Sequence, residues 1–110
     1  MRFMTLYRPG KNATAAPSQE LMAAMGKLIG KWAQAGVLVS TEGFLPSSFG
    51  ARVRIDGGEF TVTNGPFDDA RQSIGGYAIL NAESKNEAID LAKAFLQVVG
   101  EGESEIRQMH

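Results

Sequence analysis

Alternation of apolar and polar residues along the chain predicts strands, because side chains of a strand point in turn to opposite faces of a sheet. The segments with this pattern are residues 2–8, 37–45, 51–63, 76–82 and 103–109. The second of them begins as a strand and then meets Gly43. The third of them turns at Asp56-Gly57-Gly58. A turn of this kind between two alternating runs predicts a β-hairpin.

Two other segments carry apolar residues at steps of three and four, which is the spacing of one helix face. The first stripe is Leu21, Met25, Leu28 and Trp32, and the second is Ala88, Ala92, Phe95 and Val99. Pro17 suits the first turn of the first helix, and Gly36 is placed to end it. Ser84 and Glu87 form a capping box before the second helix, which we expect to end at Gly100.

The order strand, helix, strand, hairpin, strand, helix, strand predicts an α+β protein with two βαβ units in the ferredoxin-like arrangement. Right-handed crossovers would place both helices on one face of the sheet. The strands at 2–8 and 77–80 are apolar on both faces, so we expect the other face to pack on a second copy. The alternative is a monomer with a few exposed apolar residues. Gly26 and Gly30 are expected to let the first helix lie close to its neighbour.

Composition narrows the class of protein. The 110 residues are 44% hydrophobic and 21% charged, which is typical of one globular domain. No run approaches the ~18 apolar residues of a membrane span, and the N-terminus lacks a secretory pattern, so we expect a cytoplasmic protein without membrane contact. The chain has no cysteine, which excludes disulfides and thiolate chemistry. A net charge of -1 makes nucleic acid an unexpected partner.

The stretch "TNGPFDDARQSIGGYAIL" at 63–80 concentrates residues that bend a chain. Gly65 precedes Pro66, whose ring disfavours helical backbone angles in the residue before it. Asp68 and Asp69 suit the start of a short helical turn, and Gly75-Gly76 lead into the next strand. The stretch is therefore either a folding corner alone or a corner that borders a site.

The same stretch resembles the motif of the YCII-related (DGPF-domain) family, whose members read Asp-Gly-Pro-Phe and then Leu-Gly-Gly-Tyr. The segments "MRFMTLYR", "AGVLVSTEGFLPSS" and "SEIRQM" agree with the family in the same order. The resemblance covers residues 1–110 as a single domain. It implies a ferredoxin-like protomer that dimerises into an α/β barrel, within a wider group that includes isomerases, lyases and small monooxygenases acting on ring compounds and lactones.

The sequence departs from the family pattern at the motif itself. Asn64 stands where the family has aspartate, so this position cannot act as a base near neutral pH. Asp69 and Arg71 stand where the family tends to have Glu and Lys, which keeps the charge pattern. A His-Asp pair proposed as catalytic in another branch has no counterpart, since the only histidine is His110.

Any acid or base in this chain must therefore be a carboxylate or a tyrosine. Glu42 is the first candidate for a general base, because it follows the second strand, is flanked by apolar residues and matches the family's Gly-Glu-Gly segment. The alternative is a solvated acid or one paired with an arginine. Scattered acids without histidine predict no metal site.

Several other side chains are candidates for ligand contact. Arg54, Arg71 and Arg107 could hold an anion bidentately or pair with neighbouring acids. Ser48 belongs to a segment that matches the family's Pro-Ser-Ser, although a turn explains it as well. Tyr7 could line a cavity or belong to a dimer core. Together with Asn64 and Asp69, the predicted ligand-binding set contains Arg71, Arg54, Ser48 and Tyr7.

Two functions follow from these residues. The first is a cofactor-free enzyme of the lyase or isomerase kind on a small anionic or cyclic metabolite, with Glu42 as general base and an arginine stabilising negative charge. The second is a non-catalytic ligand-binding or regulatory homodimer.

Overall fold

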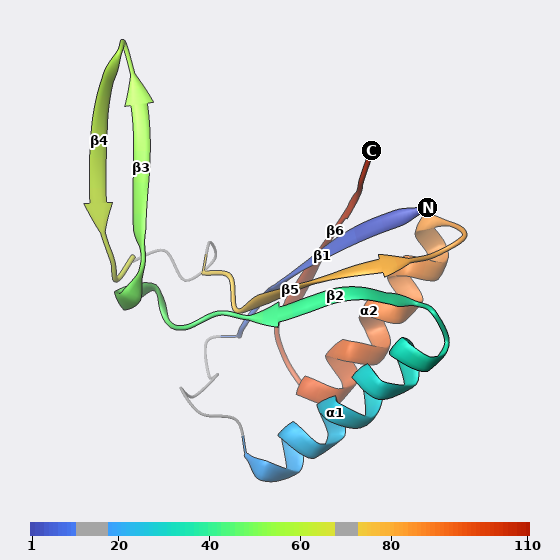
Figure 1. Ribbon diagram of the computed structural model, residues 1–110. Coiled ribbons are helices and arrows are strands. Elements are labelled where there is room, and N and C mark those ends of the chain that lie inside the picture. Colours follow the sequence, from blue (N-terminus) through green and yellow to red (C-terminus); the bar gives the residue numbers. More distant parts are fainter. Residues whose placement is uncertain (11–17, 68–72) are drawn as a thin grey trace.

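A computed structural model describes residues 1–10, 18–67 and 73–110 of the chain (Figure 1). Its elements are β1 (Arg2–Arg8), α1 (Gln19–Gln34), β2 (Leu38–Gly43), the short helix η1 (Ser47–Phe49), β3 (Ala51–Asp56), β4 (Glu59–Asn64), β5 (Gly76–Asn81), α2 (Lys85–Val99) and β6 (Glu103–Gln108). The predictions made for Pro17, Asp68, Asp69 and Arg71 fall outside the described residues.

Four strands form one antiparallel sheet in the order β2-β5-β1-β6. Both helices lie on the same side of this sheet (Figure 1). This arrangement confirms the predicted ferredoxin-like α+β fold. The last strand, β6, is at the edge of the sheet as predicted, while β1 and β5 are central.

Both helices end where the sequence predicts, and α2 also begins at its predicted cap, whereas α1 begins at Gln19 after the N-cap Ser18, so its first turn starts after position 17. The hydroxyl of Ser18 accepts a hydrogen bond from the backbone N–H of Leu21 at 3.1 Å, and Ser84 does the same for Glu87 at 3.1 Å. Each of these bonds satisfies a donor that the first helical turn leaves without a partner. Gly100 adopts a φ of 91° and ends α2. In the part of the chain that the structure describes, no helix is long and apolar enough to cross a membrane.

The core lies between the sheet and α2. Phe3 on β1 and Leu80 on β5 are opposite each other in the register, and both are 1% exposed. Phe3 packs with Ala82 and Ala88, and Leu91 and Ile106 surround this cluster. Small residues on α2 allow the helix to approach the sheet closely. The core is therefore small and depends on two large side chains.

The opposite face of the sheet, called here the open face, carries the alternate side chains of the same strands. Its centre consists of Met4 and Leu6 from β1 and of Tyr77 and Ile79 from β5, which are all half-buried. Apolar residues on both faces of β1 and β5 were predicted from the sequence. No helix in the described ranges covers the open face (Figure 1).

The prediction for Gly26 and Gly30 is wrong. A Cβ atom built at either position meets nothing within 4 Å, so neither glycine is needed for a close helix contact. Both residues are exposed on α1. The spacing of four residues suggested a packing role, but the two glycines face solvent.

Replacing Gly26 or Gly30 by alanine is expected to stabilise the protein by about 1 kcal/mol each, because alanine has the higher helix propensity and no neighbour opposes its methyl group. The matched control is Gly36→Ala, which also meets no atom within 4 Å but has a φ of 74°. It is expected to destabilise by about 1 kcal/mol. Urea unfolding of the three variants measures both signs. A loss of stability in Gly26→Ala would contradict the exposure of this helix face.

The strands β3 and β4 pair with each other as a second, two-stranded sheet. This β3–β4 hairpin projects away from the helices and from the four-stranded sheet (Figure 1). The sequence predicted the hairpin itself. The structure shows in addition that it stands apart from the main sheet.

The corner at the base of the hairpin depends on Gly65. Its backbone N–H donates to the carbonyl of Gly50 at 2.9 Å, and a Cβ at this position would overlap the backbone carbonyl of Ser47. The Ser47 hydroxyl accepts a hydrogen bond from the backbone N–H of Phe67 at 3.2 Å. The Gly65-Pro66 peptide bond is cis. The predicted corner therefore has a structural role that only glycine can fulfil.

Candidate functional site

A cavity of ≈ 870 Å³ lies between α1 and the sheet. The helix contributes an apolar wall formed by Leu21, Met25, Leu28 and Trp32, and α2 adds Phe95 and Val99. The sheet contributes Thr5, Tyr7, Thr41 and Ala78. In the strand register the side chains of these four residues lie on the same face of the sheet. This face is the one toward the helices.

Tyr7 is held in this cavity by two contacts. Its ring meets that of Phe95 edge to face, with 5.3 Å between the ring centroids. Its hydroxyl donates a hydrogen bond to the backbone carbonyl of Glu101 at 3.0 Å. Burial, and in second place the negative charge of Glu101, raises the pKa of Tyr7 above its ordinary value of 10.0. The side chain is therefore a neutral phenol at physiological pH.

Two other hydroxyl groups on the sheet side of the cavity donate hydrogen bonds to backbone carbonyls. Thr41 donates to the carbonyl of Tyr77 at 2.8 Å, and Thr5 donates to the carbonyl of Ala78 at 3.4 Å. Sequence patterns gave no reason to single out these threonines, since a threonine in a strand is common. Only the register shows that both face the same cavity.

Glu42 lies at the end of β2, where it borders the cavity and is exposed to solvent. It is opposite Tyr77 in the register, so the two side chains share the open face at the edge of the sheet. Gly76 allows this close approach of β2 and β5, because a Cβ there would lie 2.8 Å from the Glu42 carbonyl. Within residues 1–10, 18–67 and 73–110, the Glu42 carboxylate has no hydrogen bond or ion pair. The sequence led us to expect partial desolvation, whereas β2 is an edge strand, and no other element of the described residues covers Glu42 on the open face.

Aromatic side chains surround the same edge. The Tyr77 hydroxyl is 3.1 Å from the Ser40 hydroxyl, and the two share a hydrogen bond. The rings of Tyr77 and Phe44 are tilted against each other with 5.9 Å between their centroids. Phe44 also lines the cavity. A flat ligand at this edge would therefore meet ring faces as well as a carboxylate.

The structure separates the remaining predicted site residues from this cavity. Arg54 is in β3, Asn64 ends β4 and Ser48 is in η1. All three are exposed, and none of them lines the cavity. Asp69 and Arg71 lie outside the described residues. Glu42 and Tyr7 are thus the predicted site residues that line the cavity, and the register places their side chains on opposite faces of the sheet.

Charge in the cavity is negative. Among the lining residues that the structure describes, the charged ones are Glu42 and Glu101, and none is lysine, arginine or histidine. Within the same part of the chain, no group of three acids or histidines is placed to hold a metal ion. A neutral ligand fits this lining better than an anion does.

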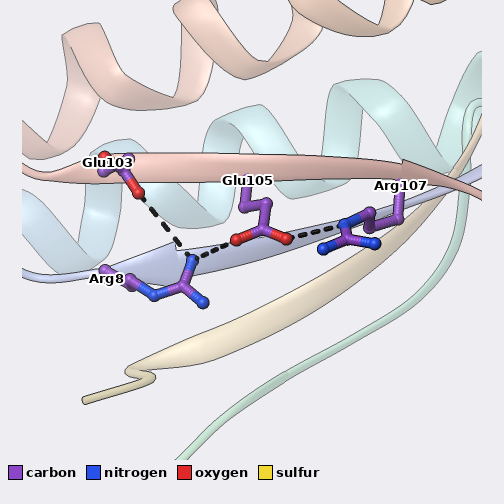
Figure 2. Close-up of polar contacts among 4 residues, drawn as sticks. All are labelled: Arg8, Glu103, Glu105 and Arg107. Atoms are coloured by element: carbon purple, nitrogen blue, oxygen red, sulfur yellow. Dashed lines mark hydrogen bonds and ion pairs between the residues drawn. The ribbon is translucent and has the colours of Figure 1, made fainter. Parts of the chain in front are cut away.

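Arg107 has a structural partner on the open face of the sheet. Glu105 accepts hydrogen bonds from Arg107 at 2.7 Å and from Arg8 at 2.9 Å, and Arg8 also approaches Glu103 at 3.8 Å (Figure 2). The hydrogen bond from Arg107 is the main reason that the pKa of Glu105 lies below its ordinary value of 4.5. Arg107 therefore pairs with a neighbouring acid, which was the alternative to ligand contact.

Comparisons with known proteins place this geometry in a family. A family model described as YCII-related domain matches residues 1–108. An uncharacterised protein of Rhizobium meliloti (strain 1021) is 27% identical over 97 residues, which cover 84% of this chain and 78% of that protein.

One solved structure with the same fold is that of 5-chloro-2-hydroxyhydroquinone dehydrochlorinase from Burkholderia phenoliruptrix AC1100, in complex with 2,5-dihydroxybenzoquinone. The match covers 100% of this chain and 94% of that chain, with a TM-score of 0.53 and 11% sequence identity. At this identity the likeness shows the fold alone. The family model, in contrast, spans nearly the whole sequence, and the chain therefore belongs to the YCII-related family.

Proposed function

We propose that the protein is a small, cofactor-free enzyme of the lyase or isomerase kind that acts on a cyclic compound. The observation that carries this proposal is the cavity of ≈ 870 Å³, which combines apolar and aromatic walls with a carboxylate that has no partner in the described residues. Ligand sites for small molecules are typically apolar clefts of ~300–1,000 Å³ with a few polar groups. The cavity has this size and this composition.

The lining favours a neutral ring over an anionic substrate. Trp32, Phe44 and Phe95 offer aromatic surface, and Glu42 and Glu101 would repel a negative charge. The structural neighbour supports a ring compound as the class of ligand, because it is named a dehydrochlorinase and was solved with a dihydroxybenzoquinone. We extend this chemistry to the present chain only as a proposal about the class of ligand.

In the proposed reaction the ring compound extends from the cavity to the edge of the sheet at β2, where Glu42 removes a proton from it. In an isomerisation the same carboxyl group returns that proton to another atom of the substrate. In an elimination the electron pair of the broken C–H bond forms a new double bond, and the leaving group departs with the electron pair of its own bond to carbon. Neither reaction changes the oxidation state of an enzyme group, so neither requires a cofactor. Tyr7, as a neutral phenol, can donate a hydrogen bond to a developing oxyanion if it releases the Glu101 carbonyl.

Trp32 makes binding directly measurable. It is the only tryptophan of the chain, it is 7% exposed, and it lines the cavity. Titration with hydroquinone, a ring compound that is uncharged at neutral pH, is expected to quench its fluorescence to saturation, whereas an aliphatic carboxylate of similar size is expected to have no effect. Free N-acetyltryptophanamide corrects for quenching in solution. Ala78→Leu, which fills the sheet side of the cavity, is expected to weaken the quenching at least ~10-fold.

Turnover of related hydroxylated and halogenated ring compounds is then followed by absorbance. Saturable binding that Ala78→Leu weakens, together with turnover, supports the enzyme. Binding without any turnover would instead favour the second function, a non-catalytic ligand-binding or regulatory dimer, for which the solvent exposure of Glu42 is the specific argument. If Ala78→Leu left the quenching unchanged, the ligand would bind outside the cavity. This result would contradict both the enzyme and the ligand-binding function proposed for the cavity.

A further inference from the structure

The cavity between α1 and the sheet is longer than a single ring requires. Leu38 and Gly43 are the first and last residues of β2 and both line the cavity, and the 6 residues of this strand span about 16 Å at ~3.3 Å per residue. The cavity volume of ≈ 870 Å³ lies toward the upper end of the ~300–1,000 Å³ range of sites that hold drug-sized ligands. A lone hydroxylated ring is much smaller than such a ligand. It would therefore leave a large part of the cavity empty.

The charged groups of the described lining gather at one end of the cavity. The register places Gly43 opposite Gly76, and Gly76 opposite Tyr7, so these three residues form one row across the sheet. Glu42 is next to this row in β2. Glu101 is beside it as well, because its backbone carbonyl accepts the hydrogen bond of the Tyr7 hydroxyl. This row, together with its two acids, is called here the polar end.

The polar end has space for a ring. At Gly43 and Gly76 the face of the sheet toward the helices carries no side chain. The chain itself requires Gly76, because a Cβ there would lie 2.8 Å from the carbonyl oxygen of Glu42. It does not require Gly43, whose φ is not positive and whose Cβ would meet, within 4 Å in the described ranges, only the carbonyl oxygen of Gly75 at 3.9 Å. The space over Gly43 is therefore open to a ligand.

The other end of the cavity is apolar. Trp32 lies there, because its backbone carbonyl accepts a hydrogen bond at 2.9 Å from the N–H of Val37, just before β2 begins. Leu28 is one helical turn before Trp32 and also lines the cavity. Between the two ends, Thr5 and Thr41 donate their hydroxyl protons to carbonyls of the sheet. A ligand group at this apolar end, formed by Leu28, Trp32 and the start of β2, would gain affinity by burying apolar surface.

We propose that the substrate is an uncharged phenolic ring compound with an alkyl side chain of butyl to hexyl length. The ring lies at the polar end, where its hydroxyl group can donate a hydrogen bond to a carboxylate and where the β2 edge is within reach. The side chain runs along α1 to the apolar end. This inference rests on the proposed function, because it assigns the substrate class of the same cavity.

Isothermal titration calorimetry of the full chain, without oxygen, tests the side chain with hydroquinone and its methyl, propyl, butyl and hexyl derivatives. Each buried methylene is expected to raise the affinity about 3-fold, so butylhydroquinone is expected to bind at least ~30-fold more tightly than hydroquinone. If hydroquinone binds and the longer derivatives bind no better, the inference about the side chain is wrong while the proposed function stands. If no member of the series binds, the proposed function is wrong as well.

Two variants locate the two parts of the ligand. Gly43→Val fills the space over the polar end and is expected to weaken binding of every member of the series at least ~10-fold, while valine remains well suited to a strand. Leu28→Trp fills the apolar end. It is expected to lower the affinity for hexylhydroquinone at least ~10-fold and to change that for hydroquinone less than ~3-fold.

Met22→Trp is the matched control on the same helix. Met22 is 60% exposed and is not among the residues that line the cavity, so both affinities are expected to stay within ~3-fold of the wild type. Far-UV circular dichroism identifies variants that have lost their fold. If Leu28→Trp left the dependence on chain length unchanged, the side chain would bind on another apolar surface. If it weakened hydroquinone and hexylhydroquinone equally, the ring would lie at the apolar end. Either result overturns the proposal.

Discussion

Glu42→Gln is expected to lower turnover of the ring substrate by about 10²–10⁴-fold, which is the usual contribution of a positioned general base. The amide keeps the size and the position of the side chain at the end of β2 but cannot accept the substrate proton. Affinity, measured by quenching of Trp32, is expected to stay within about 3-fold of the wild type. Steady-state kinetics and the fluorescence titration, carried out on the same preparation, separate the two effects.

Glu101→Gln is the matched control for this experiment. Glu101 is the other acid of the cavity lining, and only its backbone carbonyl accepts the hydrogen bond of Tyr7, so the amide leaves that contact in place. Its turnover is expected to fall less than about 3-fold. If Glu101→Gln abolished turnover while Glu42→Gln kept it, the proton would be taken on the other side of the cavity.

Phe3→Ala is expected to destabilise the protomer by about 3–5 kcal/mol, the usual cost of removing a buried aromatic ring. Phe3 and Leu80 are the large side chains that the described residues bury completely, and the cluster around Phe3 contains the small residues Ala82 and Ala88. Since small domains have a total stability of about 5–15 kcal/mol, this one change removes a large part of it. Urea unfolding followed by circular dichroism measures the loss.

Phe49→Ala makes the same chemical change at a position that is 75% exposed. It is expected to alter the free energy of unfolding by less than about 0.5 kcal/mol. Both variants are measured at the same protein concentration. An equal loss in the two variants would mean that the core is not where the sheet meets α2.

Local patterns were sufficient to predict the fold. The stripes on both helices, the caps at Ser84 and Gly100 and the alternation in the strands depend on residues near one another in the chain, and the structure agrees with each of them. The turn at Gly57-Gly58 likewise predicted the hairpin, and both glycines have positive φ angles. Local patterns could not predict the position of the hairpin relative to the four-stranded sheet, because this position depends on the backbone at the corner around Gly65.

The site was less predictable for the same physical reason. Sequence identified Glu42 and Tyr7, and both border the cavity. It could not show that Glu42 would be exposed, since burial of an edge strand depends on contacts far away in the chain. Arg54 and Asn64 are close to the family motif in sequence, yet the corner places them on the hairpin. Trp32 belongs to the apolar stripe of the first helix, and it is buried as such a stripe predicts. That it also lines a cavity depends on how α1 is placed over the sheet, which a local pattern does not determine.

The way the hairpin is joined to the main sheet has a consequence for how this protein could change in evolution. The backbone N–H of Phe44 donates to the carbonyl of Gly75 at 2.9 Å, and Gly43 is opposite Gly76 in the register. The whole segment 45–74 therefore leaves and re-enters the sheet at adjacent points, like an insertion with its ends side by side. A descendant that lost or exchanged this segment would keep the continuous four-stranded sheet and α1 and α2. Recombination at one place in the gene could thus replace this segment without rebuilding the pocket, because no residue of 45–74 is among the described residues that line it.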